Sequence, residues 1–129
     1  MNLKNKVIIV TGSNGRIGCQ VVKDLMKEGA VVISCDIKKP EKNLENFFKF
    51  DIMNLKSTKN FLSSVKKKYK KIDGLIHCAY PKTKDWGEAF ENLKYKSLSQ
   101  NLSIQLGGSI ILSQQIIKIF KKQGYGNLV

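Results

Sequence analysis

Short runs of apolar residues alternate along this chain with longer segments in which apolar residues recur every three or four positions. The short runs are continuous, which is typical of strands buried on both faces of a parallel sheet. The longer segments have helical periodicity. The pattern predicts strands at residues 6–11, 30–36, 47–50 and 72–78 and the start of a fifth at 127–129, helices at 16–28, from Asn54 or Ser57 to about 68 and at 94–122, and an exposed loop at 38–46.

Strands that alternate with helices of these lengths predict an α/β fold, in which a parallel sheet carries helices on both faces. At 129 residues the chain is one domain at most. The fifth strand has only begun at Asn127, so we expect a sheet truncated at the start of its fifth strand. In such sheets a ligand binds at the carboxyl edge of the strands.

The helical segments indicate which side chains face the core. Gly29 is expected to end the first helix and Gly124 the last. The first helix should bury Ile17, Val21, Val22 and Leu25. The helix from Lys94 to Lys122 has apolar or small residues in a stripe formed by Leu98, Leu102, Leu106, Ile110, Ser113, Ile117 and Phe120. Other apolar residues lie outside this stripe, so this helix should be covered on more than one side, by a following helix or a partner subunit.

The composition excludes several classes of protein. No segment approaches the roughly 20 apolar residues of a membrane helix, and the first apolar run breaks at Gly12, unlike a secretory signal. A cytoplasmic protein without a membrane partner is therefore expected. The three cysteines form no C-x-x-C pair and His77 is the only histidine, so no metal site is expected.

The formal net charge of +13 raises the possibility of a nucleic-acid partner. Arg16 is the only arginine, and every other basic side chain is a lysine. Proteins that read nucleic acids usually rely on arginine forks. We therefore interpret the lysines as a solvated surface and expect no nucleic-acid partner.

The segment after the first strand has the composition of a phosphate-binding turn. A buried strand, a glycine turn and a helix N-terminus together bring free backbone N–H groups to a diphosphate. The glycines allow the backbone to come close to that group. The residues predicted to bind it are Gly12, Ser13, Asn14, Gly15, Arg16, Ile17 and Gly18.

Three further positions at predicted strand ends complete a dinucleotide site. Asp36 follows Gly18 by eighteen residues and would accept both ribose hydroxyls of an adenosine, which favours NAD over NADP; the alternative is an ordinary strand-end carboxylate. Asp51 would meet the adenine amino group while Ile52 packs on the ring, or Asp51 caps a helix. After the fourth strand, a cofactor would lie close over the small residues of the segment Cys78, Ala79 and Tyr80.

At these positions the chain resembles the short-chain dehydrogenase/reductase family, which implies a Rossmann-type fold and an NAD(P) cofactor. The turn reads T-G-x-x-G-x-x-G, similar to extended members, many of which act on nucleotide-linked sugars. Short-form members place the middle glycine where this chain has Arg16. Residues 77–80 read H-C-A-Y, which is similar to the motif H-x-A-A of extended members. Residues 126–129 read G-N-L-V, which is similar to short-form members.

Other segments are similar to one branch of the family, the oxidoreductases of surface-polysaccharide and flagellin-modification sugar pathways. They are residues 79–87, 105–108 and 120–124. This resemblance implies a sugar-like substrate, for which Tyr80 and Trp86 would line a pocket; the alternative is that these aromatic residues only pack the loop. It also implies a homodimer formed through the helix from Lys94 to Lys122.

The family's catalytic Ser and its Tyr-x-x-x-Lys lie beyond the segments matched here, so we expect the N-terminal portion, 1–129, of a single NAD(P)-binding Rossmann domain. Tyr80 and Lys84 fit Y-x-x-x-K as text, but Pro81 argues against a helix there. The family's helix Asn falls at Gln105, or less well at Asn101. No catalytic residue is therefore predicted. The chain alone should be inactive; the alternative functions are a non-catalytic dinucleotide binder and, least favoured, a basic nucleic-acid binder.

Overall fold

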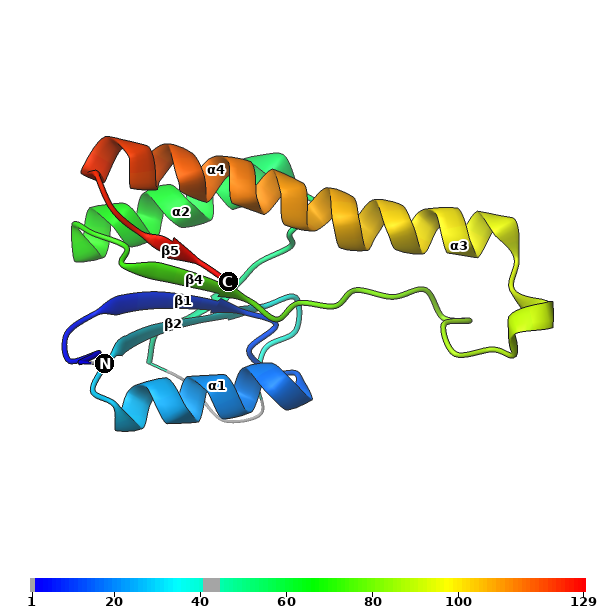
Figure 1. The fold of residues 1–129 in the computed structure, drawn as a ribbon, viewed down its shortest axis with the longest axis horizontal. Helices are drawn as coiled ribbons and strands as arrows, with labels where there is room; N and C mark the ends of the chain where they lie inside the picture. The colour runs from blue at the N-terminus through cyan, green and yellow to red at the C-terminus, as the bar shows by residue number, and fades with distance from the viewer. Residues whose placement is uncertain (1, 41–44) are drawn as a thin grey trace.

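A computed structural model describes residues 2–40 and 45–129 of the chain. Its centre is a five-stranded sheet in the order β3-β2-β1-β4-β5 (Figure 1), with every neighbouring pair parallel. The strands are β1 (Val7–Thr11), β2 (Val31–Asp36), β3 (Phe47–Lys49), β4 (Gly74–His77) and β5 (Asn127–Leu128). The predicted α/β, Rossmann-type parallel sheet is thereby confirmed. Of the loop predicted at 38–46, residues 41–44 lie outside the described residues.

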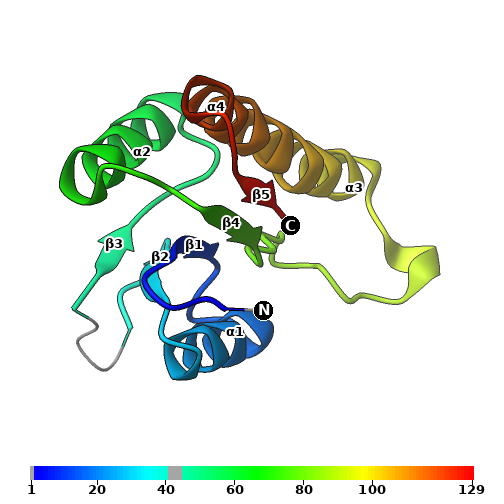
Figure 2. The same cartoon turned by 60° about the vertical axis from the view of Figure 1, so that its left-hand side comes forward.

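Helices cover both faces of the sheet, as Figure 2 shows. They are α1 (Arg16–Lys27) on one face, and α2 (Leu55–Tyr69), α3 (Tyr95–Leu102) and α4 (Gly108–Gln123) on the other. A large apolar core lies between the sheet and the α2/α4 layer, with Ile9, Ile33 and Leu75 fully buried in it. A smaller core around Val10 and Val22 lies under α1.

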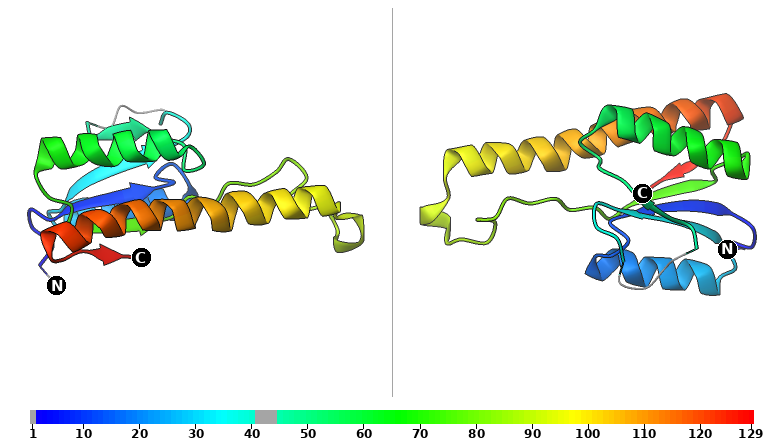
Figure 3. Two further views of the ribbon diagram at one scale, coloured as in Figure 1. Left: turned by 90° about the horizontal axis from the view of Figure 1, so that it is seen from above. Right: turned by 180° about the vertical axis from the view of Figure 1, so that it is seen from behind.

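Helices α3 and α4 form one long ribbon that extends past the edge of the sheet (Figure 3). They are joined by η2 (Ser103–Gly107), a π-helical segment. Before α3, a short 3₁₀ helix, η1 (Phe90–Asn92), lies at the far end of the loop that follows β4. The sequence predicted one uninterrupted helix here, and the π-helical segment was not foreseen.

Local signals set the helix ends. Asn54 caps α2, because its side-chain oxygen accepts a hydrogen bond from the Ser57 N–H at 2.9 Å. This settles the choice between Asn54 and Ser57. Gly124 ends α4 with φ of 80°, as predicted from its residue type. The helix α2 instead ends at Lys70, which adopts a left-handed φ of 66°.

The apolar stripe identified from the sequence of the long helix is not the side that the sheet and α2 bury. The buried residues of α4 are Gly108, Leu112, Ile116 and Phe120, and of these only Phe120 belongs to the predicted stripe. The other large apolar members are 40–61% exposed: Leu98, Leu102, Leu106, Ile110 and Ile117. The helix α4 is apolar on several sides, so more than one set of apolar residues recurs at four-residue spacing. Periodicity alone does not show which set packs against the rest of the protein.

Ile17 is a second correction, because it is 72% exposed rather than buried with Val22 and Leu25. It lies in the first turn of α1 and lines the cleft at the carboxyl ends of the strands. Within residues 2–40 and 45–129, no helix has the length and apolar character needed to cross a bilayer.

Candidate functional site

A cleft of about 670 Å³ opens where the carboxyl ends of β1, β2 and β4 meet. Its volume is in the range of small-molecule sites. Eleven predicted site residues line it: Gly12, Asn14, Gly15, Arg16, Ile17, Asp36, Asp51, Ile52, Cys78, Ala79 and Tyr80. Only Ser13 and Gly18 of the predicted set are missing from the lining. Residues not predicted also contribute, among them Lys38, Met53 and Lys82. The fold therefore brings residues from four separate segments to one place.

The packing of the protein itself requires a glycine at position 12, whether or not a ligand is bound. Its φ is +64°, and a Cβ built on it would lie 2.6 Å from both the Cα and the N of Ala79. The end of β4 therefore occupies the space that a side chain at position 12 would need. Gly18 is similarly constrained, because its Cβ would collide with the Gly12 carbonyl oxygen. Both glycines pack the turn against the sheet and the helix.

Gly15 differs from these two glycines. It lines the cleft, and the one close neighbour of an added Cβ is the Gly12 carbonyl oxygen at 3.2 Å. Its φ of −74° suits any residue. A side chain at Gly15 would therefore extend into the cleft rather than into the protein interior.

Three backbone amides at the start of α1 are free to bind an anion. The N–H groups of Ser13, Asn14 and Gly15 already donate to Cys35 O, Asp36 Oδ2 and Gly12 O. Those of Arg16, Ile17 and Gly18 have no acceptor in the described part of the chain. Free N–H groups at a helix N-terminus favour a bound anion, since the helix dipole adds to their partial charge.

Ser13 contributes a buried, unpartnered hydroxyl beneath the same turn. The residue is 3% exposed, and its Oγ is the one buried side-chain polar atom without a hydrogen-bond partner among residues 2–40 and 45–129. Buried polar atoms without partners are rare in folded proteins. A phosphate oxygen or an ordered water would supply the missing partner, so the turn fits a diphosphate group.

Asp36 joins the turn to the loop after β2. Its Oδ2 accepts from the Asn14 N–H at 3.1 Å and its Oδ1 from the Lys38 N–H at 3.2 Å. The Asn14 side chain closes the link by donating to Lys38 O. Each carboxylate oxygen keeps a further lone pair. The carboxylate thus lines the cleft as an acceptor whose position is fixed.

Asp51 and Ile52 lie at the adjoining wall. Asp51 Oδ1 accepts from the Met53 N–H at 2.9 Å, forming a local turn, while the α2 cap is Asn54. The alternative that Asp51 caps the helix is therefore wrong. Ile52 is 6% exposed and belongs to the large core, so it supports the cleft wall from inside.

At the end of β4 a buried hydroxyl orients a histidine. The Thr11 Oγ1 accepts from the Ala79 N–H at 3.3 Å and lies 2.7 Å from His77 Nδ1. Burial lowers the pKa of His77, so its ring is neutral at pH 7. The Thr11 hydroxyl and Nδ1 of the neutral ring are hydrogen-bonded to one another, and the ring tautomer sets which of them donates. Burial also raises the pKa of Cys78, which makes this thiol a poor nucleophile.

The loop after β4 is held to the long helix by two amide side chains. Asn101, 3% exposed, accepts from the Thr83 N–H at 2.9 Å and donates to Thr83 Oγ1 at 2.8 Å and to Ser97 O at 2.9 Å. Gln105 donates to Pro81 O at 3.0 Å. We call these contacts of Asn101 and Gln105 the latch. They were not predicted from the sequence, although Ser97, Asn101 and Gln105 recur at four-residue spacing and so share one side of a helix.

The latch positions an aromatic pair beside the cleft. The rings of Tyr80 and Trp86 pack edge to face with centroids 5.8 Å apart, and Tyr80 is 59% exposed. Lys84 lies in the same loop, so no helical face aligns it with Tyr80. In the described residues no group of His, Cys, Asp or Glu is arranged to hold a metal ion.

Comparisons with known proteins agree with this geometry. The family model described as short chain dehydrogenase matches residues 6–129. The chain is 36% identical over 140 residues to the post-translational flagellin modification protein A of Campylobacter coli, with 98% of this chain and 55% of that protein covered.

Two solved structures have the same fold. The structure of a short chain dehydrogenase from Leptospira borgpetersenii serovar Hardjo-bovis (strain JB197) with bound NAD+ has a TM-score of 0.84 and 26% identity, covering 98% of this chain and 51% of that one. The ligand-free aldohexose dehydrogenase of Thermoplasma acidophilum has a TM-score of 0.79 and 25% identity, covering 91% and 45%. The chain thus spans about half the length of the relatives it matches.

Proposed function

Because this chain belongs to the short-chain dehydrogenase family, we propose that its cleft binds NAD and that it forms the cofactor-binding part of an oxidoreductase. The family uses NAD or NADP. The observation that carries the proposal is the meeting of three free amides, at Arg16, Ile17 and Gly18, with the fixed carboxylate of Asp36 around one cleft.

The lining residues divide the cleft into regions suited to parts of a dinucleotide. The diphosphate fits the free amides and Gly15, with Ser13 beneath; the adenosine ribose fits Asp36, and the adenine fits Asp51 and Ile52. The nicotinamide end falls to the side lined by Cys78, Ala79 and Tyr80. When bound, the cofactor supplies the hydride. The residues of this chain bind the cofactor, orient it and cover one of its sides.

The proposed substrate of the whole protein is a hydroxyl or carbonyl group of a sugar, in a surface-polysaccharide or flagellin-modification pathway. The 36% identity to a flagellin modification protein and the likeness to an aldohexose dehydrogenase support it. Since the chain spans about half of these proteins, we propose that residues 1–129 are the N-terminal portion of one NAD(P)-binding domain.

The alternative is a dinucleotide-binding fragment without chemistry. Its support is that the described residues hold no Tyr and Lys one turn apart on a helix beside the cleft. Stopped-flow monitoring of NADH oxidation with aldoses and ketoses tests this alternative. No turnover is expected from residues 1–129; turnover by this chain alone would contradict the inference that the acid/base lies outside it.

Cofactor binding is tested at Gly15. Gly15→Val should lower the affinity for NADH at least tenfold, because its side chain would fill the diphosphate position while φ stays unstrained. The measurement is NADH fluorescence titration, with thermal unfolding to verify the fold. Gly107→Ala is the matched control, since nothing lies within 4 Å of its added Cβ. Equal NADH affinity in Gly15→Val and the parent chain would contradict the assignment.

The choice of NAD over NADP is tested at Asp36. Asp36→Ser removes the charge that repels a 2′-phosphate, so the ratio of NADPH affinity to NADH affinity should rise at least tenfold. The ratio is the proper readout, because Asp36 also holds the Asn14 N–H and its loss weakens binding of both cofactors. An unchanged ratio of NADPH to NADH affinity in the same titration would contradict the proposal that Asp36 binds the adenosine ribose.

We also propose that the long helix pairs with a second copy of the chain. Its exposed apolar residues recur along α3, η2 and α4: Leu98, Leu102, Leu106, Ile110 and Ile117. Such a stripe is larger than the single exposed apolar residues normal on a monomer surface.

A further inference from the structure

The positive charge of this chain is concentrated in two segments. Residues 55–71 and 92–129 contain twelve lysines and no acidic residue, whereas the remainder contains eleven basic and ten acidic residues. Nearly the whole net charge of +13 is therefore carried by α2, α3, α4 and the residues that flank them. These helices lie on the same side of the sheet (Figure 2).

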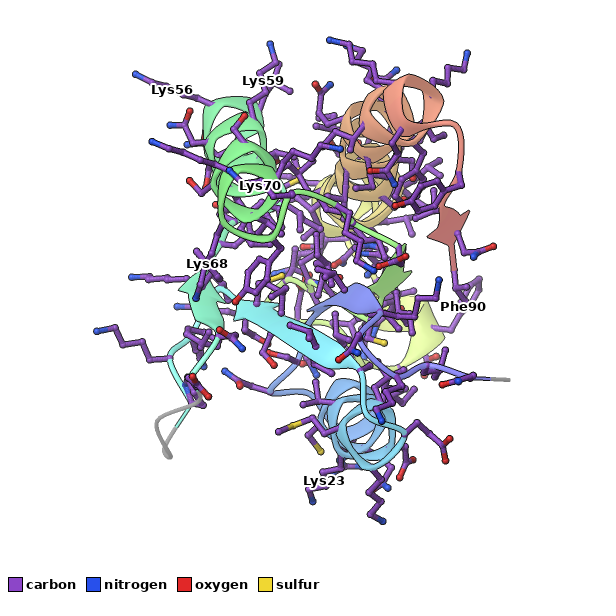
Figure 4. All side chains as sticks on the ribbon, turned by 90° about the vertical axis from the view of Figure 1, so that its left-hand side faces the viewer. Lys23, Lys56, Lys59, Lys68, Lys70 and Phe90 are labelled. Atoms are coloured by element: carbon purple, nitrogen blue, oxygen red, sulfur yellow. The ribbon has the colours of Figure 1, made fainter. Side chains whose placement is uncertain are left out.

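Four lysines on the outer side of α2 and a fifth at its C-terminal cap form a stripe, which we call the lysine face: Lys56, Lys59, Lys66, Lys67 and Lys70. Their spacings repeat along one side of the helix, opposite the buried Phe61 and Val65. The helical part of the stripe, from Lys56 to the end of α2 at Tyr69, has a length of about 20 Å at 1.5 Å per residue. Figure 4 shows Lys56 and Lys59 pointing outward on the side of the molecule opposite Lys23 of α1.

The charge of the lysine face is not neutralised within the protein. In the described part of the chain the ion pairs are made by Lys6, Lys27 and Lys71. Lys66 donates to Gln123 Oε1 at 2.9 Å, a neutral acceptor on α4. Like charges at helical spacing destabilise a helix by repulsion, so a polyanion bound at this face would relieve a strain that the fold otherwise carries.

In place of the solvated surface and the absence of a membrane partner expected from the sequence, we propose that the lysine face binds the surface of a bilayer that contains anionic phospholipids. Clusters of four to eight basic residues on a helix are attracted to such surfaces with roughly a fivefold gain per lysine. The face has no arginine fork to read bases and no aromatic ring to stack on them, which disfavours a nucleic acid. Between the exposed lysines lie only small polar residues, such as Asn60 and Ser63.

A hollow beside the stripe gives room for a headgroup. It measures about 400 Å³ and lies between α2 and β3. Lys49 and Lys56 both line it, together with the hydroxyl and amide side chains of Ser57, Asn60 and Ser64. Lysines, hydroxyls and amides are the side chains that contact phosphate oxygens elsewhere, so this composition fits the phosphate of a lipid.

The lysine face and the cofactor cleft lie on different parts of the molecule. The cleft opens at the carboxyl ends of the strands, whereas the lysine face lies on the outer side of a helix layer. A chain bound flat on a bilayer through α2 therefore leaves the cleft open. The proposal does not depend on dinucleotide binding, and NADH affinity should be the same with and without vesicles.

Co-sedimentation with vesicles tests the proposal. At 0.1 M salt the chain should bind vesicles of phosphatidylcholine with one quarter phosphatidylglycerol and not vesicles of phosphatidylcholine alone, and 0.5 M salt should release it. The triple variant Lys56→Gln, Lys59→Gln, Lys67→Gln should lower the partition coefficient about a hundredfold. The control Lys4→Gln, Lys23→Gln, Lys27→Gln removes the same charge elsewhere and should lower it less than threefold.

Three results would overturn the proposal. They are equal losses in the two triple variants, which would indicate total charge only; binding to neutral vesicles as strong as to anionic ones; and tighter binding of duplex DNA than of anionic vesicles at 0.15 M salt. Both triple variants change exposed lysines, so circular dichroism should show native folding in each.

Discussion

Asp73 is a buried carboxylate that ties the start of β4 to the start of β1. Its Oδ2 accepts from the Val7 N–H at 2.8 Å and lies 3.0 Å from the Lys71 ammonium, while Lys6 reaches Oδ1 at 3.4 Å. Burial alone would raise the pKa of Asp73, but the Val7 N–H and the two lysines outweigh it and hold the pKa below 3.8. The folded state therefore favours the charged form.

The sign of the resulting pH dependence follows from this depressed pKa. The contribution of Asp73 to stability is complete above pH 3.8 and is lost as the pH falls through the lower pKa of the folded state. Asp73→Asn should lower the free energy of unfolding by about 1–3 kcal/mol at pH 7, since it leaves buried donors poorly paired. Its acid-induced loss of stability should also be shallower.

Urea unfolding followed by circular dichroism at several values between pH 7 and pH 2.5 measures both effects. Asp24→Asn is the control, because Asp24 pairs with Lys27 at 3.8 Å with both side chains exposed. If the free energy of unfolding changes with pH in parallel for Asp73→Asn and the parent chain, Asp73 is not the cause of the loss of stability in acid.

At the scale of elements, hydrogen bonds hold the loop after β4 to the long helix. Asn101 holds it through the backbone and the hydroxyl of Thr83, and Gln105 holds it through Pro81. Thr83→Val keeps the shape but removes the hydroxyl, so Asn101 loses an acceptor while nearly buried. We expect a loosened loop, and hence a more mobile Tyr80 at the cleft.

Trp86 reports this motion directly, since it is the only tryptophan of the chain. In Thr83→Val its emission should shift to longer wavelength and acrylamide should quench it faster. Thr83→Ser, which restores the hydroxyl, should behave as the parent chain does. The latch model is wrong if Thr83→Val and Thr83→Ser give the same emission and quenching.

The regular elements were largely predictable because their signals are local. Each strand lies within two residues of its prediction, and Gly124 ends α4 where its residue type indicated. The buried side of the long helix was not predictable, since Ile116 and Ile117 are equally apolar and only the tertiary fold chooses between them. The latch of Asn101 on Thr83 is also nonlocal, because it joins residues eighteen positions apart.

At the scale of the whole molecule, the exposed stripe of α3 and α4 predicts self-association. Leu106→Lys with Ile110→Lys should convert a dimer to a monomer in sedimentation velocity at micromolar concentration, because two charges would enter an apolar interface. Asn60→Lys with Ser63→Lys adds the same charge at exposed polar positions of α2, away from that stripe. A monomeric parent chain, or equal effects of both pairs, would contradict the predicted dimer.

The position of the cleft was predictable at this scale, and its internal contacts were not. Parallel strands place Thr11, Asp36 and His77 at one edge of the sheet whatever the side chains do. That Asp36 fixes the Asn14 amide, or that Ser13 hides an unpartnered hydroxyl, depends on loop geometry. The roles of these residues toward a cofactor stay predictions until titrations test them.

The close approach of Gly12 to Ala79 limits which residues proteins with this fold can have at position 12. A protein that had abandoned its cofactor would still be obliged to keep that glycine, since its own architecture demands it. Position 15 is less restricted by the fold, since its φ is ordinary and the one close neighbour of an added Cβ is the Gly12 carbonyl oxygen at 3.2 Å. The first glycine of the turn is therefore a mark of the architecture, and its presence in a relative says nothing of whether that relative still holds a dinucleotide.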